Sequence, residues 1–498
     1  MALTGYVVSA SVPLQPSKVR ATRASTVGVV PWVLTLLSAS AWLYAGVAGA
    51  SQLLVAGLGA GVLLTLGIPL AIGSLRHPQT IAWPINVFLL ACIYFFVLDM
   101  ALLRRVEEFH PETVLIADTV IVTFLVTAIG TWCLAPLGRC PWTAVLRRVD
   151  GNLTGSTYFW MAVIAFSLEY MRRLYFVDWR IPDLVHDLLL PRGQGAFRRG
   201  GVAGDWRIFL QPIEVLFWGV AFFADRAWKN GISRFRKLVL VCLVALQLST
   251  FVLDGVRGPL LIAVILPLFA RAAQHDQTVG RWVRRLALAS FLLAPVMDIM
   301  VGARGYGWLQ LAQVERVSWN ILEAHRDDNF FWTVNLVDFI RQDGGVLAYK
   351  VPWGFIEGIQ EVGYLFFIMS VPRIFWPDKP LVTDMGDETR MWYATDSVAG
   401  SLLRYGGVTF IVLGGILFGL WIKLLEPLYL IQKGDGATIA YAFMLVITIL
   451  STRALVQGTL VSLFFILLLI LIGWGTVHAI QHLSSRLAVR VQLPRIYM

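Results

Sequence analysis

Charged residues are scarce in this sequence. Asp, Glu, Lys and Arg make up 14% of the 498 residues, whereas soluble domains carry roughly a quarter. Hydrophobic residues reach 57% and the mean hydropathy is +0.70, which excludes an ordinary soluble domain and predicts a membrane protein. The net charge of +10 fits basic cytoplasmic loops and anionic lipid head groups. We therefore expect membrane lipids, and no nucleic acid, among the partners.

Residue patterns for metal binding and covalent hydrolysis are also missing. The chain has four cysteines and no CxxC pair, which argues against a disulfide framework and a thiolate metal site. It has no HExxH motif and no GxSxG motif, so neither zinc-dependent nor serine-dependent hydrolysis is supported. We expect no metal and no other cofactor.

Long apolar runs are abundant instead. A membrane-spanning helix needs about 20 apolar residues, and about twelve runs come close to this length. They cover residues 28–48, 51–74, 82–103, 115–137, 156–172, 208–225, 237–254, 258–271, 286–302, 406–430, 437–453 and 459–479. The sequence therefore predicts an all-α polytopic membrane protein with about 12 transmembrane helices.

The basic residues predict the orientation of these spans. Most Lys and Arg residues of the short loops fall on one side, and such loops face the cytoplasm, here together with both termini. Long loops cross the membrane regardless of their charge, so the arginine-containing loops 174–207 and 303–405 are expected on the periplasmic side. The chain accordingly divides into the segments 1–27, 28–302, 303–405, 406–479 and 480–498.

The two large periplasmic loops are expected to contain short amphipathic or re-entrant helices. Residues 182–190 have the pattern of an amphipathic helix lying along the membrane surface. Residues 353–370 are apolar but interrupted by Glu357, Gln360 and Glu361, which favours a re-entrant or interfacial helix over a span.

Carboxylates also occur within the predicted spans, where a buried charge is expensive. Glu169 has helical pair spacing with Arg172 and Arg173, an arrangement that usually stabilises helix bundles. The other acids in spans are Asp99, Asp118, Glu214 and Asp298.

Arginines on the periplasmic side are not explained by topology and suggest an anionic ligand. Arg257 lies in the turn 254–261, where a Gly-Pro pair predicts a helix start with free backbone N–H groups, a site suited to phosphate. An interfacial ion pair with Asp254 is the alternative. Arg304 adds a cation at the end of the next span, where snorkelling to the membrane surface would also explain it.

The segment 372–380, PRIFWPDKP, holds an acid beside cations in a turn that its prolines stiffen. Arg373, Asp378 and Lys379 are its candidate functional residues, and a structural corner is the alternative. Arg390 and Arg404 are close enough in sequence to share one charged pocket with it.

These features together resemble the O-antigen polymerases (Wzy-type), which polymerise oligosaccharide repeat units. The likeness rests on the turn GVRGPLL at 255–261, the segment 372–380, the motif RYGG at 404–407 before a glycine-rich span, and the helix plan with two outer loops. The shared motifs lie within residues 237–430, and the rest of the chain is similar only in its arrangement of helices. Val256 departs from the serine that relatives often have at that position.

The resemblance implies a metal-independent glycosyltransferase of the bacterial inner membrane with a periplasmic active site. It would move a growing glycan from undecaprenyl diphosphate onto a newly delivered lipid-linked oligosaccharide repeat unit, and a chain-length regulator protein is a candidate partner. Cations would bind the diphosphate, and a carboxylate, Asp378 or in second place Glu361, would take the acceptor proton. The diphosphate-binding candidates are Arg257, Arg304, Arg373, Lys379, Arg390 and Arg404.

Three other functions stay open at this point. An O-antigen ligase has a similar architecture but depends on a loop histidine, and here only His325 lies in the large loop. A polyprenyl-sugar transferase of the GT-C type needs acids in its first outer loop, which residues 48–51 do not supply. A flippase for lipid-linked oligosaccharides, or another transporter, needs charges along a path through the bundle, whereas most charges here lie outside the predicted spans.

Overall fold

The computed structural model describes residues 61, 78–97, 109–135, 153–190, 211–255, 257–274, 278–285, 296, 299–300, 303, 307–309, 329–342, 397–431 and 435–453. Every regular element in these residues is a helix, which confirms the all-α class for the described part of the chain. Among the described residues, three helices are long and apolar enough to cross a membrane: Pro111–Leu134, Arg234–Leu253 and Val398–Tyr429. The total of about twelve spans stays a prediction.

Most of the described helices coincide approximately in position with predicted spans. They are η1 (Pro78–Ala82), α4 (Pro84–Cys92), η2 (Ile93–Val97), α6 (Pro111–Leu134), α8 (Gly155–Phe176), α9 (Ile181–Leu189), α11 (Gln211–Trp218), α12 (Val220–Lys229), α13 (Arg234–Leu253), α14 (Arg257–Ala273), α17 (Asn329–Gln342), α19 (Val398–Ile431) and α20 (Asp435–Arg453). The predicted spans 28–48 and 459–479 lie outside the described residues, and 51–74 and 286–302 are described only at single positions.

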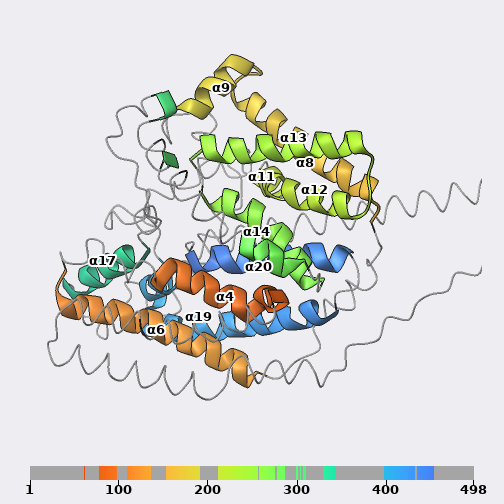
Figure 1. Cartoon of the computed structure of the whole chain (residues 1–498). Helices are drawn as coiled ribbons and strands as arrows, with labels where there is room; N and C mark the ends of the chain where they lie inside the picture. The colour runs from red at the N-terminus through yellow and green to blue at the C-terminus, as the bar shows by residue number, and fades with distance from the viewer. Residues whose placement is uncertain are drawn as a thin grey trace, which may run out of the picture.

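Two groups of helices form the bundle (Figure 1). One contains α8, α11, α12 and α13, with α9 above it, and the other contains α4, α6, α19 and α20, with α17 at one end. Helix α14 lies between the groups and packs on α12, α13 and α20. Aromatic side chains fill both cores: Phe217 contacts Phe251 in the first group, and Phe124 contacts Phe418 in the second.

Much of the surface of the long helices is apolar. On α13, Phe235 and Leu238 are 74% and 61% exposed, and Leu417 on α19 is 66% exposed. Water would be a poor solvent for such surfaces, whereas lipid chains match them. The exposed apolar faces therefore agree with the membrane insertion that the length of these helices suggests.

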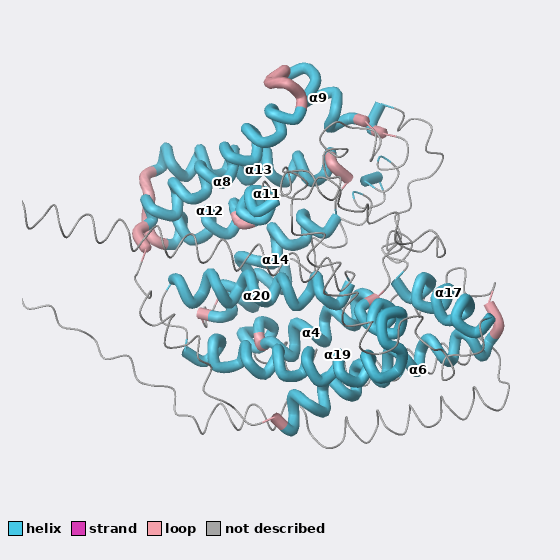
Figure 2. Tube along the Cα trace, turned by 180° about the vertical axis from the view of Figure 1, so that it is seen from behind, coloured by secondary structure: helices cyan, strands magenta, loops and turns pink. Residues whose placement is uncertain are grey.

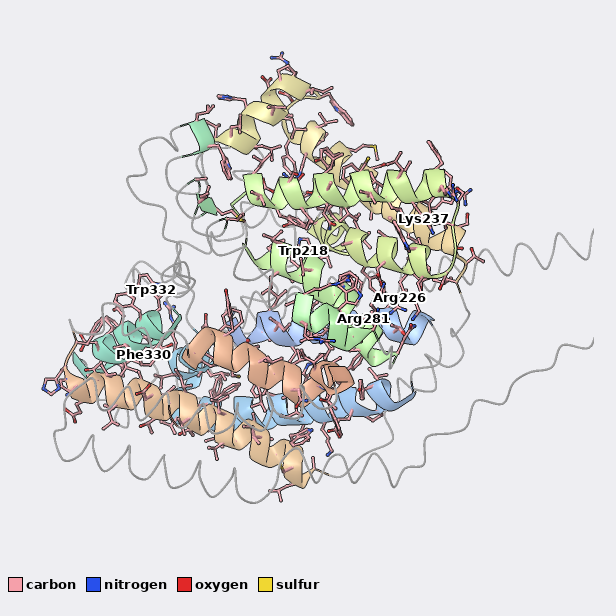
Figure 3. All side chains as sticks on the ribbon, viewed as in Figure 1. Trp218, Arg226, Lys237, Arg281, Phe330 and Trp332 are labelled. Atoms are coloured by element: carbon pink, nitrogen blue, oxygen red, sulfur yellow. The ribbon has the colours of Figure 1, made fainter. Side chains whose placement is uncertain are left out.

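One end of the bundle is strongly basic. Asn230 Nδ2 donates to Leu153 O at 3.0 Å and Lys229 Nζ to Gln274 Oε1 at 3.1 Å, which brings the ends of α8, α12 and α14 together. We call this the basic end; its cations include Arg226, Lys229, Arg234, Arg236, Lys237, Arg271 and Arg281. Figure 3 shows Arg226, Lys237 and Arg281 toward this end and Phe330 and Trp332 of α17 toward the other.

Helix α9 confirms that the residues predicted as a helix at 182–190 are helical, and its position along the membrane surface stays a prediction. Leu184 and Leu188 are buried, whereas Ile181 and Val185 are 66% and 52% exposed. The described loops gather at the ends of the helices, and α9 lies beyond the end of α8 (Figure 2). Helix α17, within the predicted loop 303–405, was not anticipated from the sequence.

Glycines allow α6 and α19 to pack closely. Gly415 lies against Phe124 and Gly419 against Ala128, so the two helices run parallel, as their predicted directions require. A Cβ atom on Gly415 would come within 2.9 Å of the Phe124 carbonyl oxygen. Small residues at such a spacing let helix backbones approach one another within a membrane.

Two predicted spans differ in detail from the helices of the structure. The predicted span start at residue 406 coincides with a break at Gly406 and Gly407, which divides α19 into a short helix from Val398 and a long helix after the break. Gly407 has φ 62° and ψ −154°, a conformation essentially restricted to glycine. The RYGG motif therefore ends the short helix, and the long apolar helix starts after it, as the sequence suggested. The predicted span 208–225 is two helices, α11 and α12, which meet at Gly219.

We expect Gly415→Ala and Gly419→Ala each to lower the free energy of unfolding by about 1–3 kcal/mol, because the added methyl group overpacks the contact with α6. Gly130→Ala on α6 is the matched control, since a Cβ there has nothing within 4 Å. Thermal unfolding in detergent measures the effect. Equal midpoints for all three variants would contradict the close contact.

Candidate functional site

Five charged side chains meet at the end of the first helix group opposite the basic end. Helix α8 contributes Glu169, Arg172 and Arg173, α11 contributes Glu214, and Asp254 follows α13. We call these five residues the ionic network. Salt bridges join them in the order Asp254, Arg173, Glu169, Arg172, Glu214. The charges therefore alternate from the turn after α13 across α8 to α11.

The centre of the ionic network is fully buried. The Glu169 side chain is 0% exposed and accepts hydrogen bonds from Arg172 Nε at 2.8 Å, Arg172 Nη2 at 2.9 Å and Arg173 Nε at 2.8 Å. Buried ions are tolerated only when they are paired and hydrogen-bonded in this way. The pairing of Glu169 with both arginines, predicted from their spacing, is confirmed.

Arg173 connects α8 to the turn after α13. It donates from Nη1 and Nη2 to the two carboxylate oxygens of Asp254, at 3.2 and 2.7 Å. The sequence left open whether Asp254 pairs with Arg257, and the structure gives it Arg173, 81 positions away. The bidentate geometry is the strong form of a guanidinium–carboxylate contact, so Arg173 fixes the position of this turn.

The turn itself prepares the start of α14. Gly255 has φ 63°, and α14 begins at Arg257, which confirms the helix start predicted from the Gly-Pro pair. Trp308 Nε1 donates to Leu253 O at 2.7 Å, so part of the predicted loop 303–405 lies against the same turn. Only the backbone of Arg257 is described, and Arg304 lies outside the described residues.

Arg404 lies in the second helix group, just before the break in α19. It is 8% exposed, and its neighbour Tyr405 is 1% exposed. Ser397 caps this part of α19, accepting from Gly400 N at 3.1 Å, and its hydroxyl contacts Thr333 Oγ1 of α17 at 2.9 Å. Arg404 is therefore a buried cation beside irregular backbone, not a residue of an exposed loop.

The other predicted site residues cannot be placed. Glu361, Arg373, Asp378, Lys379 and Arg390, and the predicted re-entrant helix at 353–370, lie outside the described residues. Whether they join the turn before α14 stays a prediction. Among the described residues, no group of three His, Cys, Asp or Glu side chains is placed to hold a metal ion.

A second buried charge pair was missed in the sequence. Lys423 and Glu426 on α19 lie 3.4 Å apart, with side chains 4% and 2% exposed. Glu426 Oε1 also accepts from Trp83 Nε1 at 3.1 Å and from Trp132 Nε1 at 2.7 Å, which ties α19 to α6 and to the start of α4. The i, i+3 spacing of the pair within a span was the available signal.

Comparisons with known proteins add no family assignment. No protein-family model matches the chain, and no curated protein or solved structure is significantly similar to it.

We expect Arg173→Ala to lower the free energy of unfolding by about 3–5 kcal/mol, because it removes the guanidinium that pairs with the buried Asp254 carboxylate and one of the two guanidiniums that pair with Glu169. Arg180→Ala is the control: Arg180 is 74% exposed and 3.9 Å from Asp183, and exposed pairs contribute little. Chemical denaturation in detergent checks both variants. An effect of Arg173→Ala no larger than that of the control would show that the ionic network does not stabilise the bundle.

Proposed function

We propose that this protein is an integral-membrane glycosyltransferase that polymerises oligosaccharide repeat units linked to undecaprenyl diphosphate. The reaction would take place at the periplasmic face of the bacterial inner membrane, in a chain with about twelve spans and both termini in the cytoplasm. The proposal starts from the resemblance of residues 255–261, 372–380 and 404–407 to the O-antigen polymerases.

The observation that carries the proposal is the meeting of three features at one end of the bundle. They are the α13–α14 turn with Arg257 at its helix start, the residues 307–309 of the long loop, and the ionic network that holds the turn. This end lies opposite the basic end, which the positive-inside rule places in the cytoplasm. A cation at a helix start, on the side to which lipid-linked repeat units are delivered, suits a diphosphate.

The proposed chemistry needs little beyond positioned charge. Fixed cations at Arg257, Arg304, Arg373, Lys379, Arg390 and Arg404 would stabilise the charge that grows on the leaving diphosphate. The first residues of α14 would add backbone N–H groups to this set. A carboxylate would accept the proton of the attacking hydroxyl, for which the sequence offers Asp378 and Glu361. The lipid chain would lie along the exposed apolar helix faces.

A transporter of lipid-linked oligosaccharides is the second candidate. The sequence argued against it because most charges lie outside the spans, but Lys423, Glu426 and Asp118 are charged and buried within α19 and α6. Lys423 and Glu426 are held by each other and by two tryptophans, which is typical of a fixed contact. We therefore rank transport second. An O-antigen ligase comes third, because no described residue gives evidence for it.

Deletion of the gene and complementation with variants tests the proposal. With wild-type protein we expect a ladder of long surface glycans, and with Arg257→Ala or Arg404→Ala we expect single capped repeat units, because diphosphate binding is lost. Arg180→Ala, at the exposed N-cap position before α9, should retain the ladder. Gel separation of the surface glycans, at matched protein levels, is the measurement.

Other outcomes have distinct meanings. Loss of the single repeats together with accumulation of lipid-linked units inside the cell would support the transporter. Accumulation of full-length glycan on the carrier lipid would support the ligase. A ladder in the Arg257 and Arg404 variants would contradict their assignment to the diphosphate site.

A further inference from the structure

The three carboxylates of the ionic network differ in how they are held. Glu169 is 0% exposed and accepts three guanidinium hydrogen bonds, and Asp254 is 6% exposed and accepts two. Glu214 is 39% exposed and has a single contact of 3.4 Å, from Arg172 Nη2. Glu169 and Asp254 therefore have structural roles, whereas Glu214 is held by one long contact and is partly exposed.

The charge balance of the network also favours proton uptake at Glu214. Three carboxylates face two guanidiniums, so the five side chains carry a formal charge of −1. Arg172 gives its two short bonds, at 2.8 and 2.9 Å, to Glu169 and only the long one to Glu214. Glu214 is therefore the most weakly held carboxylate, and its protonation removes the fewest hydrogen bonds from the network.

The position of Glu214 suits a reaction at the start of α14. Helix α11, which carries it, packs against both α8 and α14. The same network ends at Asp254, next to the Gly255 turn from which α14 starts. Arg172 and Arg173 are occupied by carboxylates, so an anionic substrate would find its cation at Arg257 rather than within the network. The network therefore connects Glu214, through the two arginines and Glu169, to the turn before α14, and glycosyl transfer from a diphosphate calls for a carboxylate and a cation at one site.

We infer that Glu214 is the catalytic carboxylate that accepts the proton of the acceptor hydroxyl, an inference that rests on the polymerase function proposed above. The hydroxyl oxygen attacks the anomeric carbon of the donor sugar and forms the new glycosidic bond. The bond from that carbon to the diphosphate oxygen breaks, and undecaprenyl diphosphate leaves with the electron pair. The hydroxyl proton passes to the Glu214 carboxylate, whose side chain is 39% exposed, and then to water.

The test uses the full-length protein in detergent or vesicles, with undecaprenyl-diphosphate-linked repeat units as substrate. Glu214→Gln keeps the shape of the side chain but cannot take a proton, so the elongation rate should fall by roughly 10²–10⁴-fold. KM should change little, and Glu214→Asp should restore part of the rate. With wild-type protein the rate should rise with pH through the titration of one carboxylate, and this limb should vanish in Glu214→Gln.

Controls separate catalysis from structure. Glu112→Gln removes a carboxylate that is 59% exposed and pairs with Arg341 at the α6–α17 contact, and it should leave rate and pH profile unchanged. Asp378→Asn and Glu361→Gln should retain the pH-dependent limb if Glu214 is the base. A purely structural Glu214 would lower the unfolding midpoint in Glu214→Gln while the pH profile stays as in wild type, and this result overturns the inference.

The two proposals fail in different ways. If wild-type protein elongates repeat units and Glu214→Gln does so at the same rate, only the role of Glu214 is wrong. If wild-type protein elongates no lipid-linked repeat unit, the polymerase function is overturned, and the inference about Glu214 falls with it.

Discussion

The structure depends on the cost of placing charge among apolar helices. A carboxylate or guanidinium in such surroundings is stable only with a partner, and the described helices supply partners from distant parts of the chain. Arg173 of α8 pairs with Asp254, which follows α13. Glu426 of α19 accepts from two tryptophans that belong to the region of α4 and to α6. These contacts between helices therefore also fix which helices are neighbours.

The same constraint separates structural cations from cations that could bind a ligand. Arg172 and Arg173 are buried and occupied by carboxylates, and Arg271 at the basic end contacts Asp225. A diphosphate would have to displace these contacts at high cost. Arg257 begins α14 and Arg404 lies beside the α19 break, and the function proposed above assigns these two cations to the diphosphate.

Glycine has two roles in the second helix group. Gly415 and Gly419 let α19 approach the backbone of α6, and Gly406 and Gly407 break α19 next to Arg404. All four glycines belong to α19. The turns that follow the break are therefore anchored on α6 by Gly415 and Gly419. A rigid helix with one irregular turn presents a buried cation at a defined place, which a flexible loop could not do.

Hydrophobicity and local spacing by themselves determined most of the described helices, with α17 as an exception. The apolar runs located the helices from α4 to α14 and α19 to α20, the amphipathic pattern located α9, and i, i+3 and i, i+4 spacing paired Glu169 with Arg172 and Arg173. These features depend on residues within a few turns of one another. The start of a span at residue 406 was predicted, but the short helix that precedes it from Val398 was not. Only the tertiary structure decided that Asp254 pairs with Arg173, that Glu214 is the open end of the network, and that Glu426 is bound by Trp83, 343 positions away. Such contacts are chosen by helix packing, and no spacing along the chain encodes them.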